Sequence, residues 1–169
     1  RLSLVGSEMC IRDRICNLLD EAASSLPAIR TNKEDYGLAT SVGAKAVKAK
    51  MLLYAASPLF NGNSSFYSNF TDKSGSQLMP LTYDPNKWVK AKTAIKEAID
   101  LAEQNGHALY VKQDYKIGNE DANPYPAAGP VRCLRTSLVD WDSRNPEVLL
   151  AETRSEGSYG IQNKSLPFV

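Results

Sequence analysis

Hydrophobic residues recur at helical spacing along three stretches of the chain. In the first stretch, residues 15–26, apolar side chains follow the i, i+3, i+4, i+7 spacing of a helix with one buried face. Pro27 comes directly afterwards, and a proline rarely continues a helix. The pattern therefore predicts a helix that ends at Leu26 and is followed by a polar loop.

The second stretch, residues 40–57, is apolar around most of its circumference. Thr40 and Ser41 are both suitable N-caps, and Pro58 ends the pattern. We expect Lys45 and Lys48 to point away from the buried side. The stripe that we expect to be buried consists of Val42, Ala46, Ala49, Leu53 and Ala56.

Small residues near the start of this second helix indicate close packing. Gly43 is followed by Ala44 and Ala46, and a glycine inside a helix costs about 1 kcal/mol relative to alanine. We expect a packing role to offset that cost. The prediction is that Gly43 lets the backbone of another helix come close.

The third stretch, residues 84–106, carries the clearest helix signals. Asp84 is a suitable cap, Pro85 suits the first helical position, and Gly106 suits a left-handed C-terminal residue. The inner face is expected to contain Trp88, Ala91, Ala94, Ile95, Ala98, Leu101 and Ala102. We expect this helix to pack on the second one through two sets of residues: Ala46, Ala49 and Leu53, against Ala91, Ile95 and Ala98. Trp88 is expected to be a buried core anchor.

The segments between and after these helices read as loops. Residues 58–83 contain aromatic side chains among Asn, Ser and Gly, and loops this long inside a domain are usually functional or disordered. The aromatic content argues against disorder. Residues 112–146 show no periodicity, and residues 146–154 fit a short strand or a return to a helix.

The first residues read as foreign to the rest of the chain. Residues 4–14, LVGSEMCIRDR, resemble the translation of a transposase-adapter sequence used in library preparation. We therefore expect residues 1–14 to be an adapter artefact and residues 15–169 to be a partial helical domain without its natural N-terminus. The alternative is that this string is the genuine start of the first helix.

Charge and composition narrow the classes of partner. The chain has 20 Lys+Arg and 19 Asp+Glu, which gives no electrostatic reason to expect nucleic acid as a partner. No apolar run approaches the roughly 20 residues of a membrane span. Three cysteines without a CxxC pair, and a single histidine, make a metal site or a disulfide framework unexpected. No cofactor is expected.

No catalytic constellation stands out in the sequence. Asp140 and Asp142 flank Trp141, but neighbours along a chain usually point apart, whereas a glycosidase needs two carboxylates across a cleft. His107 follows a predicted helix end and is expected to cap it or lie on the surface. Cys133 is expected to be a small core residue. We therefore expect no enzyme and no catalytic residue.

Aromatic rings in the predicted loops are the better candidates for a ligand site. Phe66, Tyr67 and Trp141 lie among amide side chains, and sugar rings have apolar faces that stack on aromatic rings. The competing interpretation is that each ring fastens its loop to the helical body. We expect these three residues to contribute to ligand binding.

Two long segments resemble the SusD/RagB family of Bacteroidetes surface lipoproteins. They are DYGLATSVGAKAVKAKMLLYAASPLFNGN and YDPNKWVKAKTAIKEAIDLAEQNGHALY. LLDEAASSLP before them and RNPEVLLAETR after them stand in the order that the family shows. Leu38 departs from the pattern, because members often carry Arg there. The resemblance covers roughly residues 15–169, and the family's variable binding residues are not carried over.

The resemblance implies a fold, a location and partners. The fold is mainly α, built on tetratricopeptide-like helix hairpins with long irregular loops. The full-length protein would be held at the outward-facing surface of the outer membrane by a lipid anchor that this fragment lacks. It would bind a nutrient, in many members a glycan, and cap a SusC-like TonB-dependent transporter.

Two other functional classes stay open. A tetratricopeptide-type scaffold that binds only protein would show a regular repeat near 34 residues, whereas the two best helices are separated by a long loop. A helical enzyme that cleaves glycans would need facing carboxylates in a pocket. The sequence offers no clear pair.

Overall fold

The computed structural model describes residues 8–110 and 145–151. Its helices are α1 (Glu8–Ser25), the 3-10 helix η1 (Lys33–Asp35), α2 (Ser41–Ala56), the single turn α3 (Ser64–Tyr67) and α4 (Asn86–Gln104). Within these residues the extended pairing is limited to one isolated bridge between Thr71 and Gln77. The mainly helical fold predicted from the sequence is confirmed.

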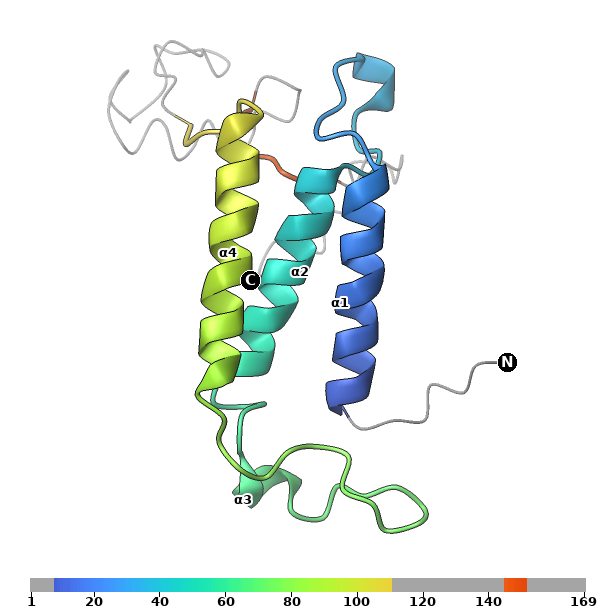
Figure 1. Cartoon of the computed structure of the whole chain (residues 1–169), viewed down its shortest axis with the longest axis vertical. Coiled ribbons are helices and arrows are strands. Elements are labelled where there is room, and N and C mark those ends of the chain that lie inside the picture. The colour runs from blue at the N-terminus through green and yellow to red at the C-terminus, as the bar shows by residue number, and fades with distance from the viewer. Residues whose placement is uncertain (1–7, 111–144, 152–169) are drawn as a thin grey trace, which may run out of the picture.

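The three long helices lie side by side, with α2 in the middle (Figure 1). α1 and α4 run in one direction and α2 runs in the other, so each contact is antiparallel. Among the described elements, α2 contacts both α1 and α4, which do not contact each other. The loop that contains α3 lies at one end of this layer, and η1 lies at the other end.

The ends of α2 and α4 lie within two residues of the ends predicted from the sequence. Thr40 caps α2 as predicted, because its Oγ1 accepts a hydrogen bond of 3.0 Å from the Gly43 N–H. At the start of α4, Asp84 Oδ1 accepts from the Asn86 N–H at 2.9 Å. Gly106 follows α4 with a φ of 86°, in the left-handed region that favours glycine.

α1 begins earlier than the prediction of residue 15. It starts at Glu8, so its first turns lie within the segment that the sequence assigns to an adapter. Arg12, in one of these turns, is buried. A chain can form such turns whatever the origin of the codons, so the adapter origin of residues 1–14 stays a prediction.

The core between α2 and α4 is built mainly from alanines. Ala49, Leu52 and Ala56 of α2 form one buried cluster with Ala91, Ala94 and Ala98 of α4, and Ile95 packs against it. The predicted pairing of these two helices is therefore confirmed for Ala49, Ala91, Ile95 and Ala98. Such small side chains allow two helix axes to approach closely.

Two residues that the sequence placed in the core are on the surface. Leu53 is 41% exposed while Leu52 is buried, and Trp88 is 41% exposed while Lys87 is only 6% exposed. Successive residues of a helix point about 100° apart, so an error of one position turns a side chain out of the interface. The predictions for Leu53 and for Trp88 as a core anchor are wrong.

Lys87 can occupy the inner face because its head group has a partner. Its Nζ donates to the Phe60 carbonyl at 3.3 Å, at the end of the interface where the chain leaves α2. A lysine stem is apolar and can pack in a core while its ammonium group reaches an acceptor.

Lys45 and Lys48 of α2 face α1 and do not point to open solvent. Lys45 donates to Asp20 Oδ1 at 2.9 Å, and Lys48 donates to Asp20 Oδ2. Lys45 also lies 3.7 Å from Glu97 of α4. The hydrogen bonds from Lys48 and Lys45 lower the pKa of Asp20, and the bond to Asp20 raises the pKa of Lys45. The predicted orientation of Lys45 and Lys48 is therefore wrong.

Gly43 packs against the final described segment, not against a helix. A methyl group in place of its hydrogen would lie 3.2 Å from Thr40 Oγ1 and 3.5 Å from both the Leu149 carbonyl and Leu150 Cδ1. Residues 145–151 form no helix or strand. The predicted close approach exists, but its partner is this irregular segment.

The ion pairs of Asp20 predict a pH-dependent stability. The pKa of Asp20 is lowered in the folded state, so its stabilisation is present above the unfolded-state pKa and is lost as the pH falls through the folded-state pKa. Asp20→Asn should lower the free energy of unfolding at neutral pH by about 1 kcal/mol, a limit set by solvent screening of exposed pairs. Urea unfolding measures this difference, which should vanish in acid.

Glu21→Gln is the matched control, because Glu21 is the exposed neighbour on the same helix. It should change the unfolding free energy little at either pH. An equal loss for Asp20→Asn at neutral and acidic pH would contradict the assigned ion pairs.

Candidate ligand-binding site

The loop between α2 and α4 is closed at its base by one buried asparagine. Asn61 Nδ2 donates to the Asp84 carbonyl at 2.9 Å, and Asn61 Oδ1 accepts from the Asp84 N–H at 2.9 Å. The same Nδ2 lies 3.4 Å from the Ala56 carbonyl. The end of α2 and the start of α4 are thereby joined through a single side chain.

Gly62 allows the two ends of the loop, near residues 62 and 83, to come into backbone contact. Its φ is 79°, and a Cβ at this position would lie 2.4 Å from the backbone nitrogen of Tyr83. Any other residue would meet both an unfavourable φ and a backbone clash. The Asn61–Gly62 pair therefore fixes where the loop begins and ends.

Side-chain amides order the part of the loop that carries the rings. Asn63 Oδ1 accepts from the Phe66 N–H at 3.2 Å and so caps α3. Gln77 Nε2 donates to the carbonyls of Tyr67 at 2.8 Å and Phe70 at 3.1 Å. The loop is held by its own hydrogen bonds, as expected for a preformed site.

The loop tip is also ordered locally. Asp72 Oδ1 accepts from the backbone N–H groups of Ser74 at 2.8 Å and Ser76 at 2.9 Å, and from the Ser74 hydroxyl. These bonds, led by the one from the Ser74 side chain, lower the pKa of Asp72. Asp72 is exposed, so its role is to shape the turn.

Three aromatic rings gather around the ring of Tyr67. Its ring centroid lies 4.9 Å from that of Phe66 in an edge-to-face arrangement, 6.0 Å from that of Phe70, and 6.5 Å from that of Phe60. These are favourable separations for aromatic pairs. We call Phe60, Phe66, Tyr67 and Phe70 the loop ring cluster.

The cluster combines the two interpretations that the sequence allowed. Tyr67 is half-buried at its centre, where it holds the loop together, while Phe66 is 69% exposed. The structure thus brings Phe66 and Tyr67 together as candidate ligand contacts. Trp141 lies outside the described residues, as do Cys133, Asp140 and Asp142.

An apolar hollow lies next to the loop ring cluster. It has a volume of about 450 Å³ and is lined by residues of α1, α2 and the loop, among them Tyr54, Phe60 and Phe70. Met51 and Met79 add flexible side chains to its walls. This hollow has no signal in the sequence, because its walls come from three separate elements.

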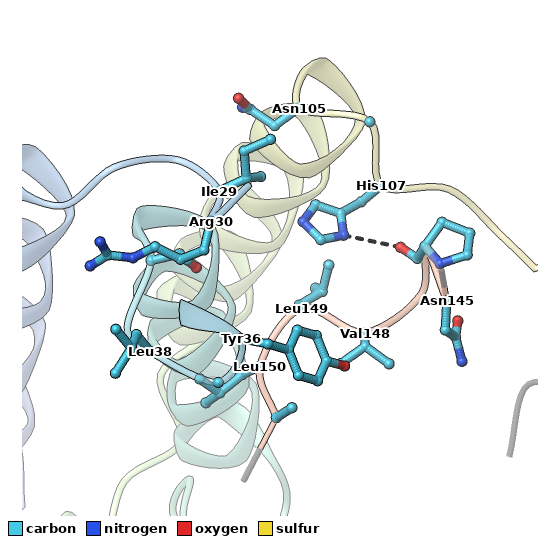
Figure 2. Close-up of a pocket in the computed structure, with 15 residues that line it drawn as sticks. Ile29, Arg30, Tyr36, Leu38, Asn105, His107, Asn145, Val148, Leu149 and Leu150 are labelled. Carbon is cyan, nitrogen blue, oxygen red and sulfur yellow. Dashed lines mark hydrogen bonds between the residues drawn. The ribbon is translucent and has the colours of Figure 1, made fainter. Parts of the chain in front are cut away.

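A second cavity lies at the opposite end of the helices, near η1 (Figures 1 and 2). It has a volume of about 220 Å³, and its walls combine residues 29–40, residues 105–107 and residues 145–151. His107 Nδ1 lies 3.0 Å from the Pro146 carbonyl, drawn as the dashed line in Figure 2. The backbone N–H of His107 also donates to the Ala102 carbonyl at the end of α4, as expected for a capping residue.

Two negative findings concern the described residues alone. Within residues 8–110 and 145–151, no three His, Cys, Asp or Glu side chains are grouped in a way that could hold a metal ion. In the same part of the chain, every helix is too short or too polar to cross a membrane.

The described part of the chain is therefore a mainly helical array that carries an ordered aromatic loop. Protein-family models give no match, and no curated protein matches the chain. The chain is similar to the solved structure of BT4246, a Bacteroides thetaiotaomicron protein, with 45% sequence identity and a TM-score of 0.60. The selenomethionine form of BT4246 gives 45% identity and a TM-score of 0.58.

Both comparisons cover 64% of this chain and 19% of the BT4246 chain. This chain thus spans about a fifth of the length of its solved neighbour. The likeness is one of sequence as well as fold, and it points to a Bacteroides-type protein.

The clamp formed by Asn61 generates a stability prediction. Asn61→Ala should lower the free energy of unfolding by about 2–3 kcal/mol, because it leaves the backbone groups of Asp84 without their partner in a largely buried place. Chemical denaturation of the purified chain measures the loss. Asn63→Ala is the control, because Asn63 caps only the short, exposed α3 and should cost about 1 kcal/mol or less. Equal losses in the two variants would rule out a special role for the clamp.

Proposed function

We propose that the full-length protein binds an oligosaccharide or similar nutrient at the outer-membrane surface, as a SusD/RagB-type partner of a SusC-like TonB-dependent transporter. The observation that carries this proposal is the loop ring cluster, in which Phe66 is exposed on an ordered loop. The resemblance of residues 35–63 and 83–110 to that family supports it. The 45% identity to a Bacteroides thetaiotaomicron protein is consistent with it.

The chemistry of the loop suits a neutral carbohydrate. An exposed ring offers an apolar face to the C–H face of a sugar, while amides and hydroxyls are suitable partners for sugar hydroxyls. Ser65 and Asn69 are exposed, are the sequence neighbours of Phe66 and Phe70, and supply such groups. The loop needs little reordering on binding, because Gln77 and Asn63 already hold it.

The proposed activity is binding without cleavage. Stacking on rings depends on contact and shape and not on charge, so the affinity should change little with salt concentration. Trp141 is part of the proposed site on the basis of the sequence alone.

A protein-binding scaffold of tetratricopeptide type is the second candidate. Stacked antiparallel helices favour it in general terms. Against it, α2 begins at residue 41 and α4 at residue 86, a spacing well beyond the roughly 34 residues of such repeats. The intervening loop also has its own helix and hydrogen bonds. Nutrient binding is therefore the function that the geometry favours.

Substitution of Phe66 tests the site. Phe66→Ala should weaken binding of the recognised oligosaccharide by about tenfold, the effect of losing one stacking ring. Isothermal titration with malto-, cello- and xylo-oligosaccharides measures it, at low and high salt. Phe66→Leu keeps an apolar side chain without a ring and should lose nearly as much. Ile99→Ala, an exposed residue on α4, is the control and should bind as wild type.

Three outcomes would count against the proposal. Unchanged affinity in Phe66→Ala would remove this ring from the site. Strong weakening by salt would indicate a charge-driven site. Release of shorter products from an incubated glycan would overturn binding without cleavage. The transporter partner is tested separately, by co-purification of the full-length protein with a TonB-dependent transporter from outer membranes.

A further inference from the structure

Two apolar stripes run along neighbouring helices, one on α1 and one on α2. Each stripe holds three large apolar residues at the i, i+4, i+7 spacing of a single helix face. The members are Ile11, Ile15 and Leu18 on α1, and Val47, Met51 and Tyr54 on α2. The two helices lie side by side and run in opposite directions (Figure 1). We call these residues the paired stripes.

The paired stripes are exposed although they are apolar. Met51 is half-buried, and the other members are between 36% and 58% exposed. At the loop end of the helices the stripes meet in the apolar hollow of about 450 Å³, which Ile15, Met51 and Tyr54 line together with Phe60 and Phe70 of the loop. An exposed apolar surface that joins several large side chains marks an interaction site.

The opposite side of the same two helices is polar. Asp20 follows Leu18 by two residues and Lys45 precedes Val47 by two, which is a rotation of about 200° around each helix. On that side Lys45 donates to Asp20 at 2.9 Å, and Lys48 donates to the other carboxylate oxygen of Asp20. One side of α1 and α2 is therefore satisfied by ion pairs and water, whereas the side of the paired stripes is not.

The shape of this apolar surface fits a helix. Two neighbouring helices with aligned stripes form a groove, and the side-chain ridges of a further helix pack into such a groove. A small ligand fits less well, because ligand pockets place several polar groups among apolar walls, whereas the paired stripes offer only the Tyr54 hydroxyl. This chain spans about a fifth of the length of BT4246, so a protein of that length has ample further chain to supply a helix.

We propose that the paired stripes form the docking groove for an amphipathic α-helix from the part of the full-length protein outside this chain. The apolar face of that helix lies along the groove and its polar face meets solvent. Its end nearest the loop abuts Phe60 and Phe70. The proposal does not depend on the function proposed for the loop, because it uses neither Phe66 nor Tyr67.

Hydroxyl-radical footprinting of the full-length protein tests the groove with side chains of one chemical type. Leu18 is 46% exposed, Leu59 in the loop is 47% exposed, and Leu52 in the α2–α4 core is 9% exposed. In the full-length protein we expect Leu18 to be oxidised as slowly as Leu52 and severalfold more slowly than Leu59, because the docked helix covers Leu18. Val47 and Val89, at 41% and 61% exposed, form a second pair in which Val47 should be the slow member.

Three results would overturn the proposal. The first is equal oxidation of Leu18 and Leu59 in the monomeric full-length protein. The second is protection of Leu18 that appears only as the protein concentration rises, which would place a second copy on the groove. The third is slow oxidation of Leu18 in the 169-residue chain by itself, which would place the occupant within this chain. Slow oxidation of Leu52 is the internal check that the chain is folded.

A charge in the groove gives an independent measurement. Leu18→Glu keeps a good helix former but places a carboxylate against the docked helix. It should lower the melting temperature of the full-length protein by several degrees and leave that of the 169-residue chain nearly unchanged. Leu59→Glu is the matched control and should change neither. Equal shifts for Leu18→Glu in the two proteins would contradict the docking groove. If the full-length variant fails to fold, footprinting of the wild-type protein still decides the proposal.

Discussion

The contact between α2 and α4 is the interaction on which the rest of the described structure depends. Alanines on both helices form most of this interface, and Leu52 is the largest buried side chain in it. Alanine loses no side-chain entropy on burial and keeps the helix axes close, so the interface is tight although each side chain contributes little apolar area. α1 is added to this pair on the other side of α2, partly through Asp20 and the two lysines that it meets.

The helix pair also determines what its two ends can do. At one end, the close approach lets Asn61 bridge the end of α2 and the start of α4, which turns the intervening residues into a closed loop with a ring cluster. At the other end, Gly43 and the end of α4 receive residues 145–151, and that docking completes a small cavity. The same packing thus supports an exposed aromatic surface at one end of the helices and a small, partly open cavity at the other.

Features of the fold with a local signal can be predicted from the sequence. The ends of α2 and α4 follow from Thr40, Asp84 and Gly106, because caps and left-handed glycines act within a few residues. The sequence does not determine which side of a helix is buried when most of its circumference is apolar. α2 is apolar nearly all round, so periodicity could not separate Leu52 from Leu53, and Lys45 and Lys48 look like surface residues until Asp20 is placed opposite them. The grouping of Phe66 with Tyr67 follows from their shared loop, whereas the cavity at His107 requires a segment about 40 residues away and has no local signal.

Native-state hydrogen exchange of the backbone amides tests the central role of the α2–α4 contact most directly. If the alanine interface holds the structure, the slowest amides of α2 and α4 exchange through one common opening with the same, highest free energy. Amides in the first turns of α1 and in the loop tip around Asp72 then exchange through smaller, separate openings. Slow exchange in α2 together with independent, faster exchange along the whole of α4 would contradict the account.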